Sequence, residues 1–321
     1  MNTDRIFLRR KREIGEILSD GFQFIRQNFK VIGKTLVRFV GPFFLLQVFM
    51  NSFYSYTTSE VLNGTEGGGF GGFEAIFAGL PLVAIIGLIL TSILFYTMLN
   101  GTVLGIFESY LKNDGLIKIE DVGHSLKKNW PQLLGATFVI ILFGGIVGSI
   151  ITVPISLIGT GIGSAALILL FVFLAALAVL VFVAVPVSLV FPIMIFDKEN
   201  VFQAIGDAYR YLAGNWLLTF LAFVVVYLIS IVITSIFQLP LVIYMLVQQL
   251  SGGVGVVNPS AGSDWIMIIL TTISQFFQYA ISALIPIFTA FIYFNLHERK
   301  HKTGVYQEID SIGSTENQTY N

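Results

Sequence analysis

Two histidines and a glutamate near the C-terminus have a spacing that can hold a metal ion. His297, Glu298 and His301 form the pattern HExxH at residues 297–301. On a helix, the two histidines can bind zinc while the glutamate acts as a general base. An arginine and a lysine inside the pattern would repel a cation, and the nearest downstream acid is Glu308. We therefore interpret the segment as a charged membrane anchor, with a membrane metalloprotease as the remote alternative.

Other groups that could do chemistry are scarce. The chain has no cysteine, which excludes disulfides, thiolate metal sites and thiol nucleophiles. Ionisable side chains deep in apolar stretches mark ion or proton pathways, but Lys34, Arg38 and Glu108 lie near the ends of such stretches. We expect no catalytic residue, cofactor or metal, and ion-coupled transport through charged side chains is disfavoured.

The composition indicates an integral membrane protein. Of the 321 residues, 55% are hydrophobic and only 12% are charged, whereas a soluble domain has about 25% charged residues. A water-soluble enzyme, a disordered protein and a nucleic-acid binder are all disfavoured by this balance. The N-terminus is basic and has no short apolar core before a small-residue cleavage site, so we expect no removable signal peptide.

Six stretches are apolar enough for a helix that crosses the hydrocarbon core, which needs about 20 residues. They cover residues 31–56, 75–110, 132–157, 165–196, 216–247 and 265–296. The second, fourth, fifth and sixth exceed a minimal span, so these helices must tilt, kink or protrude from the bilayer. Six spans place both termini on the same side.

The charges between these stretches predict which side that is. All 18 basic residues lie in the N-terminal segment, residues 112–131, residues 197–215, the C-terminal tail or the first turns of the adjoining span. The opposite loops contain no basic residue, and their acidic residues are Glu60, Glu66, Glu74 and Asp264. Because basic residues near span ends stay inside, we expect both termini in the cytoplasm.

A short pattern occurs three times, before the first, third and fifth stretches. An aspartate is followed at constant spacing by an asparagine and an aromatic residue. The copies are Asp20, Asn28 and Phe29; Asp121, Asn129 and Trp130; and Asp207, Asn215 and Trp216. Each copy has a stripe of apolar residues on one helix face, broken only by Gly123. The stripes are Leu18, Phe22, Ile25 and Phe29; Ile119, Gly123, Leu126 and Trp130; and Ile205, Tyr209, Leu212 and Trp216.

We interpret each copy as an amphipathic helix in the membrane interface, followed by a turn into the membrane. The asparagine is predicted to cap the next span, the aromatic residue to lie at headgroup depth, and Gly214 to end the third interfacial helix. Independent selection of similar junctions is the alternative to true repetition.

The predicted fold is an all-α integral membrane protein with six transmembrane helices, arranged as three repeats of an interfacial amphipathic helix plus a helical hairpin. Residues 1–299 are predicted to form a single membrane domain, with repeats at about 13–111, 112–198 and 199–299. Residues 300–321 are polar and without periodicity, which predicts a disordered cytoplasmic tail.

Two further groups of residues predict contacts. Gly144 and Gly148 form a GxxxG pair for close helix packing, either within the chain or with another copy. A set of basic residues is predicted to contact phospholipid headgroups, near which each charge is worth about 1 kcal/mol; topological anchoring is the alternative. These residues are Arg9, Arg10, Lys11, Arg12, Lys34 and Arg38.

The junction into the fifth stretch resembles that of a bacterial family. Ile-Phe-Asp-Lys-Glu-Asn at residues 195–200, with the continuation to Trp216, and Tyr-Phe-Asn-Leu-His-Glu-Arg at 293–299 are similar to segments of a six-span membrane domain. This domain is fused to some glycerophosphodiester phosphodiesterases and also occurs in stand-alone proteins of unknown function. The opening from Arg9 to Lys34 resembles stand-alone members from Bacteroidota. The resemblance implies a bacterial cytoplasmic membrane protein and not the phosphodiesterase activity, because no carboxylate set for that activity is present.

We expect a non-enzymatic, multi-pass protein of the bacterial cytoplasmic (inner) membrane that acts as a scaffold or accessory subunit in an envelope process. Its expected partners are membrane phospholipids and other inner-membrane proteins, and not nucleic acid. The alternative is a carrier or transporter of a lipid or another hydrophobic small molecule. A cavity that is open to one side and lined by Asn51, Asn100 and Gln275 would favour the carrier.

Overall fold

The computed structural model describes residues 5–64, 82–158, 166–250 and 265–301. Within these ranges every regular element is an α-helix, which confirms the predicted all-α class. The helices are α1 (Ile14–Phe39), α2 (Gly41–Gly64), α4 (Leu82–Lys112), α5 (Ile119–Ile158), α6 (Ala166–Ser188), α7 (Val190–Phe196), α8 (Val201–Leu212), α9 (Trp216–Leu250), α10 (Trp265–Ser282) and α11 (Leu284–His301). Of the predicted tail at residues 300–321, Lys300 and His301 belong to α11. The rest of this tail and the loop acids Glu66, Glu74 and Asp264 lie outside the described residues.

Apolar helices long enough to cross a membrane are present among the described residues. Three qualify by length and composition: Leu82–Lys112, Trp216–Val247 and Ile269–His301. A fourth is added if Ile14–Phe39 and Gly41–Tyr54, which meet at 59°, form one bent span. These helices are consistent with a membrane protein. The count of six spans stays a prediction; α5 and the α6–α7 pair cover the third and fourth predicted stretches.

The predicted boundary between interfacial helix and span is wrong in two of the three copies. α1 continues through Asn28, and α5 continues through Asn129. Both side-chain amides bond within their own helix, to the carbonyl oxygen of Phe24 at 3.0 Å and to Ser125 Oγ at 3.4 Å. The first bend comes later, beside Pro42, because proline has no N–H to continue the hydrogen-bond ladder.

The third copy has the predicted break. α8 ends at Leu212, and Gly214 adopts a φ of +78°, a conformation that glycine reaches without steric penalty. α9 then begins at Trp216, and the carbonyl oxygen of Asn215 accepts the backbone N–H of Thr219 at 3.0 Å. The predicted role of Gly214 at the end of this helix is therefore confirmed.

The predicted apolar stripes contain both buried and exposed side chains. Leu126 and Leu212 are buried, whereas Phe22, Phe29, Trp130 and Tyr209 are exposed. Their neighbours on the adjacent face are buried, namely Ile17, Phe24, Val122, Ala204 and Ala208. Apolar residues thus cover two neighbouring faces of these helices, and the more deeply buried one packs on the protein. Gly123 breaks the stripe where a Cβ would lie 3.0 Å from the Phe39 ring.

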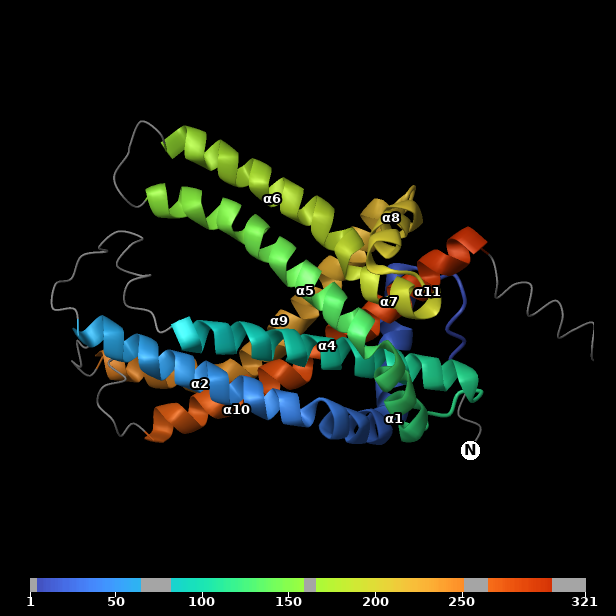
Figure 1. The fold of residues 1–321 in the computed structure, drawn as a ribbon, viewed down its shortest axis with the longest axis horizontal. Helices are drawn as coiled ribbons and strands as arrows, with labels where there is room; N and C mark the ends of the chain where they lie inside the picture. The colour runs from blue at the N-terminus through green and yellow to red at the C-terminus, as the bar shows by residue number, and fades with distance from the viewer. Residues whose placement is uncertain (1–4, 65–81, 159–165, 251–264, 302–321) are drawn as a thin grey trace, which may run out of the picture.

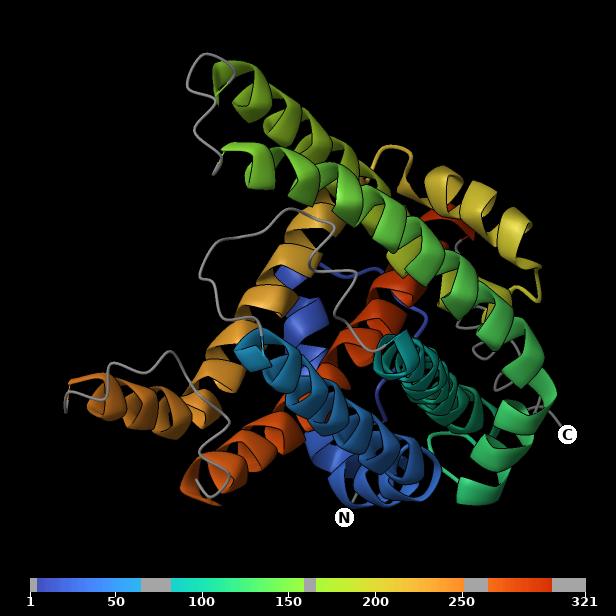
Figure 2. The same ribbon diagram turned by 60° about the vertical axis from the view of Figure 1, so that its left-hand side comes forward.

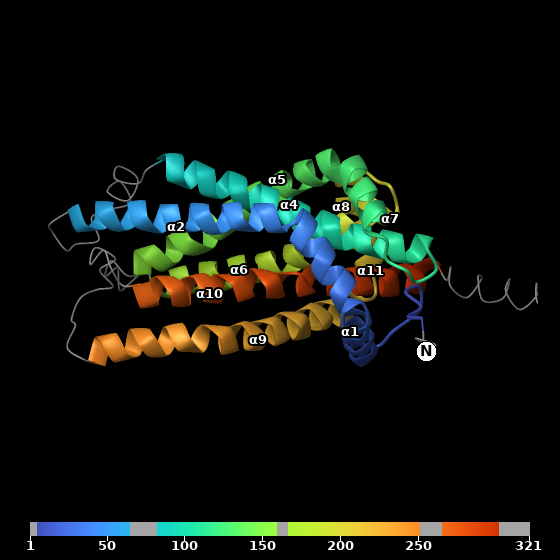
Figure 3. The same ribbon diagram turned by 90° about the horizontal axis from the view of Figure 1, so that it is seen from below.

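The main hydrophobic core lies at one end of the molecule, where the N-terminal segment, α7, α8 and α11 meet the adjoining ends of α1, α4 and α5 (Figures 1 and 3). We call this the packed end. Phe24 of α1 stacks on Phe107 of α4 with ring centroids 4.8 Å apart, and it meets Phe291 of α11 edge-on at 5.8 Å. These aromatic contacts join the first, second and last parts of the chain.

At the opposite end, which we call the open end, the helices diverge. The α5–α6 hairpin separates from α2, α4 and α10 in both views (Figures 1 and 2). Closer to the packed end, a groove of about 390 Å³ lies between the last turns of α6 and the first half of α9, beside the main core. Apolar side chains dominate its lining, which includes Ala184, Val185, Phe220, Phe223 and Leu228.

The close approach of α1 to α11 generates a stability prediction. A Cβ added at Gly21 would lie 2.8 Å from Cδ1 of the buried Phe288 ring. Gly21→Ala should therefore lower the free energy of unfolding by about 1–3 kcal/mol, measured by denaturant unfolding in detergent. The matched control is Gly33→Ala on the same helix, where a Cβ meets no described atom within 4 Å. The control should stabilise the helix by roughly 0.5–1 kcal/mol, and equal effects of the two changes would contradict this packing.

Candidate functional site

The N-terminal segment is held on the packed end by a buried guanidinium group. The Arg12 side chain is fully buried, and its Nε donates to Asp20 Oδ2 at 2.8 Å. Its terminal nitrogens donate to the carbonyl oxygens of Leu8, at 2.7 Å, and of Phe7. The guanidinium carbon also lies 5.4 Å from the centre of the Phe291 ring. Because a buried charge is stable only when paired and hydrogen-bonded, these contacts fix the path of the segment.

The same segment is tied to α4 and α11 through its backbone. The Arg12 N–H donates to Asn295 Oδ1 at 2.8 Å, and Arg299 donates to the Arg12 carbonyl oxygen at 2.8 Å. Arg299 Nε also donates to Asn295 Oδ1 at 3.2 Å. Further along, the Ile6 N–H donates to the Tyr110 hydroxyl at 3.1 Å. The segment therefore links helices that are far apart in the sequence.

The predicted headgroup contacts divide into two groups. Arg12 is a correction, because its buried side chain is engaged by Asp20 and by backbone carbonyls and does not face a lipid surface. The sequence predicted a headgroup contact for Arg12 as for its neighbours, because a run of basic residues does not indicate which side chain is buried. The remaining members are exposed: Arg9, Arg10, Lys11, Lys34 and Arg38.

All three repeated aspartates form ion pairs at the packed end. Asp20 pairs with Arg12 and with Arg10 at 2.8 Å, Asp121 pairs with Lys112 at 2.9 Å, and Asp207 pairs with Arg210 at 2.7 Å. The hydrogen bonds that Lys112 and then Asn113 donate to Asp121 lower the pKa of its carboxyl group. The ion-pair partners do not follow one spacing, so the pattern of basic residues did not reveal them.

A second contact does follow one spacing, because each aspartate faces the residue eight positions before it. Asp20 accepts from Arg12 Nε at 2.8 Å, and Asp121 accepts from Asn113 Nδ2 at 2.8 Å. In the third copy this position is Glu199, whose carboxyl group adjoins that of Asp207. Two copies therefore have a permanent hydrogen-bond donor where the third has a second acid.

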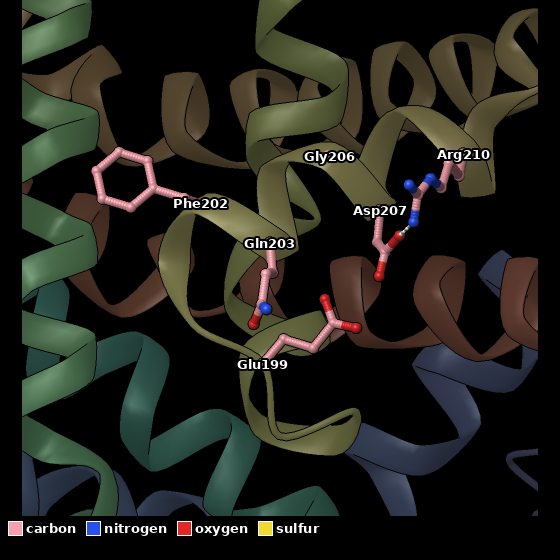
Figure 4. Close-up of a pocket in the computed structure, with 6 residues that line it drawn as sticks. All are labelled: Glu199, Phe202, Gln203, Gly206, Asp207 and Arg210. Carbon is pink, nitrogen blue, oxygen red and sulfur yellow. Dashed lines mark hydrogen bonds and ion pairs between the residues drawn. The ribbon is translucent and has the colours of Figure 1, made fainter.

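Glu199 and Asp207 belong to an open pocket of about 400 Å³, drawn in Figure 4. Its other lining residues are Phe202, Gln203, Gly206 and Arg210. Figure 4 shows the two carboxyl groups pointing toward one another, with Arg210 bonded to the far side of Asp207. Burial is the main cause that raises the pKa of Glu199 to about 7, and the neighbouring Asp207 is the next. The hydrogen bond with Glu199 is the main cause that lowers the pKa of Asp207. The hydrogen bond from Arg210 lowers it further, and partial burial acts in the opposite direction.

A polar cluster around Asp197 lies at the end of α7. Its carboxylate accepts from the Tyr293 hydroxyl at 2.6 Å and from the Tyr211 hydroxyl at 2.9 Å. Burial and this carboxylate raise the pKa of Tyr211. The Tyr211 hydroxyl lies 3.4 Å from His301 Nε2, and its ring lies 4.5 Å from Lys300 Nζ. Sequence reasoning quoted Asp197 as part of a junction but gave no signal that it holds α8 to α11.

The HExxH pattern lies at the end of α11. The rings of His297 and His301 have centroids 4.8 Å apart, and His297 Nε2 is 3.9 Å from Asp197 Oδ1. Glu298 is buried. Within the part of the chain that the structure describes, no group of three or more histidine, aspartate or glutamate side chains is arranged to hold a metal ion. Glu308, the acid considered for a third ligand, lies outside that part.

The remaining sequence candidates are dispersed. Gly144 and Gly148 lie on α5, and a Cβ at either position would meet no atom of the described residues within 4 Å. Asn51 donates to the Tyr279 hydroxyl at 3.2 Å, and Asn100 donates to a carbonyl oxygen of its own helix at 2.9 Å. Gln275 has a buried Oε1 without a partner among the described residues. None of the amides named for a carrier cavity lines the groove between α6 and α9.

Comparisons of the chain with protein families, with curated proteins and with solved structures found no match. The resemblance to the phosphodiesterase-associated membrane domain therefore stays a prediction.

The contacts of Arg12 predict unequal effects for two neighbouring arginines that share Asp20. Arg12→Ala should lower the free energy of unfolding by about 3–5 kcal/mol, because it leaves a buried carboxylate short of its main partner. Arg10→Ala should lower it by less than about 1 kcal/mol, because the Arg10 side chain is 47% exposed. Unfolding of both variants in the same detergent provides the measurement, and a larger loss for Arg10→Ala would contradict the assignment.

Proposed function

We propose that the chain is a non-enzymatic scaffold or accessory subunit of a bacterial cytoplasmic membrane. The observation that carries the proposal is the contrast between the two ends of the molecule. Buried polar contacts join the packed end into one unit, whereas the α5–α6 hairpin diverges at the open end (Figures 1 and 2). The packed end can hold the α5–α6 hairpin in place, while the apolar surface of the hairpin is free to bind the spans of other membrane proteins.

The surface of the hairpin supports this role. Large apolar side chains are exposed along both of its helices, and Phe171 is 70% exposed. Others are Phe138 and Leu142 on α5, and Leu174, Val179 and Phe182 on α6. Lipid chains are as apolar as these side chains, so association in the membrane depends on close packing rather than on hydrophobicity. A helix face with little internal packing leaves that contact to be made by a partner.

The exposed basic residues of the packed end support contact with phospholipid headgroups. Arg9, Lys11, Lys34 and Arg38 are exposed there, and each such charge near an anionic leaflet contributes about 1 kcal/mol. The proposal includes six spans in three repeats, with both termini in the cytoplasm. The charge distribution along the chain and the recurring contact between each aspartate and the eighth residue before it favour this arrangement.

The proposal predicts where a partner binds. A photoreactive amino acid replacing Phe171 on α6 should crosslink in native membranes to one membrane protein that also copurifies in stoichiometric amount. The matched control replaces Ile236 on α9, which is 58% exposed and should crosslink only to lipid. Native mass spectrometry of the gently extracted complex then gives its stoichiometry.

The same experiment distinguishes the proposal from the carrier alternative. Lipid adducts alone at both positions, together with the absence of a stoichiometric protein in the extracted complex, would contradict the scaffold. A defined lipid retained by the purified chain without a protein partner would favour lipid handling instead.

A further inference from the structure

The three copies of the aspartate pattern show what is unusual about the third. Arg12 and Asn113 donate to Asp20 and Asp121 at any pH at which the protein is folded. Glu199 occupies the same position relative to Asp207, eight residues before it, but a carboxylate only accepts hydrogen bonds. Glu199 can therefore take the role of the other two residues only when it carries a proton.

Local structure fixes Glu199 in this position. Asn200 caps α8 by accepting the Gln203 N–H at 3.0 Å, which places Glu199 just before the helix begins. Glu199 Oε2 is buried and has no hydrogen-bond donor among the described residues. The carboxyl groups of Glu199 and Asp207 face one another across the pocket in Figure 4.

We propose that Glu199 and Asp207 form a proton-operated latch between α8 and the α7–α8 connection. When Glu199 is protonated, its O–H donates to the Asp207 carboxylate and holds the connection on the helix. When the proton leaves to solvent, two carboxylates face each other, and the connection separates from α8. The latch stands on its own geometry and does not depend on the proposed scaffold role.

The surroundings of the pair allow this change of charge to act locally. The charged and titratable groups around it are Asp207, Arg210 and Tyr211 on α8, Asp197 at the end of α7, and Lys300 on α11. Arg210 is bonded to Asp207, and Asp197 is engaged by two tyrosine hydroxyls. Neither contact gives Glu199 a donor. Beyond these groups, His297 Nε2 lies 3.9 Å from Asp197 Oδ1, and His301 Nε2 lies 3.4 Å from the Tyr211 hydroxyl.

The pKa of the Glu199 carboxyl group determines in which direction the latch responds to pH. Burial and the Asp207 charge raise the pKa of Glu199 from 4.5 to about 7. A raised pKa of an acid means that the folded protein prefers the protonated form. The stability that the latch contributes is therefore fully present below about pH 4.5 and is lost as the pH rises through about 7. The latch acts at the start of α8, whose first turn carries the exposed Phe202.

Spin labels can follow α8 directly, because the chain has no native cysteine. Cysteines replace Phe202 on α8 and Leu116 before α5, both of which are exposed. Pulsed EPR on the full chain in lipid nanodiscs should give a narrow distance distribution in acid that broadens or shifts with a midpoint near pH 7. Glu199→Gln, which keeps a donor at every pH, should retain the narrow distribution throughout.

Controls separate the latch from other titrations. Glu120→Gln, an exposed acid at the start of α5, and His301→Gln should leave the pH transition unchanged. If Glu199→Gln does not fold, Asp207→Asn removes the facing charge and should abolish the transition in its place. A distribution that does not change with pH in the otherwise unmodified chain would overturn the latch. A transition that persists in Glu199→Gln, or is lost in His301→Gln, would assign it to another group and also overturn it.

Discussion

Removing the Arg12 guanidinium from water is the constraint on which the packed end depends. A buried guanidinium needs hydrogen-bond acceptors for its N–H groups, and here Asp20 and the carbonyl oxygens of Phe7, Leu8 and Arg10 accept four hydrogen bonds from it. To reach these acceptors the chain must fold back over the start of α1. The backbone of the same residue is then close enough to bond with Asn295 and Arg299 on α11. One charge thus joins the beginning of the described chain to its end.

The three aspartate copies show how one local plan can serve different purposes. Each aspartate lies on a helix at the packed end and faces the eighth residue before it, but that residue is an arginine, an amide or an acid. The arginine forms a buried ion pair with its aspartate. The amide forms a partly exposed hydrogen bond, and Lys112 forms an additional ion pair with the same aspartate. The acid gives a contact that depends on protonation. The residue eight positions before the aspartate, rather than the aspartate itself, therefore determines whether the contact is buried, partly exposed or dependent on protonation.

Much of the fold was predictable from the sequence, and the errors have identifiable causes. Composition and hydropathy gave the all-α class, and Gly214 marked a true helix end because a φ of +78° excludes most other residues. The asparagine caps at positions 28 and 129 failed because an asparagine amide also bonds one turn back within a continuous helix. The apolar stripes did not indicate which side chains would be buried, because helices at the packed end are apolar on two sides and only tertiary contacts select the inner one.

The site was harder to predict than the fold. Arg12 and its exposed neighbours are chemically alike in the sequence, and only the path of the chain turns one of them inward. Asp197 acquires its role from tyrosines on α8 and α11, 14 and 96 residues away. Glu199 was visible as part of a junction, but its meaning emerges only when the three copies are compared in space. Charge patterns therefore located the packed end without identifying the residues that hold it together.

Hydrogen exchange of the N-terminal segment tests the central claim most directly. In the intact protein the amides of Ile6 and Arg12 donate to side chains of α4 and α11, so peptides covering residues 5–13 should be protected nearly as well as those of α11. Exchange of this segment at the rate of an unstructured peptide, while α11 stays protected, would contradict the account.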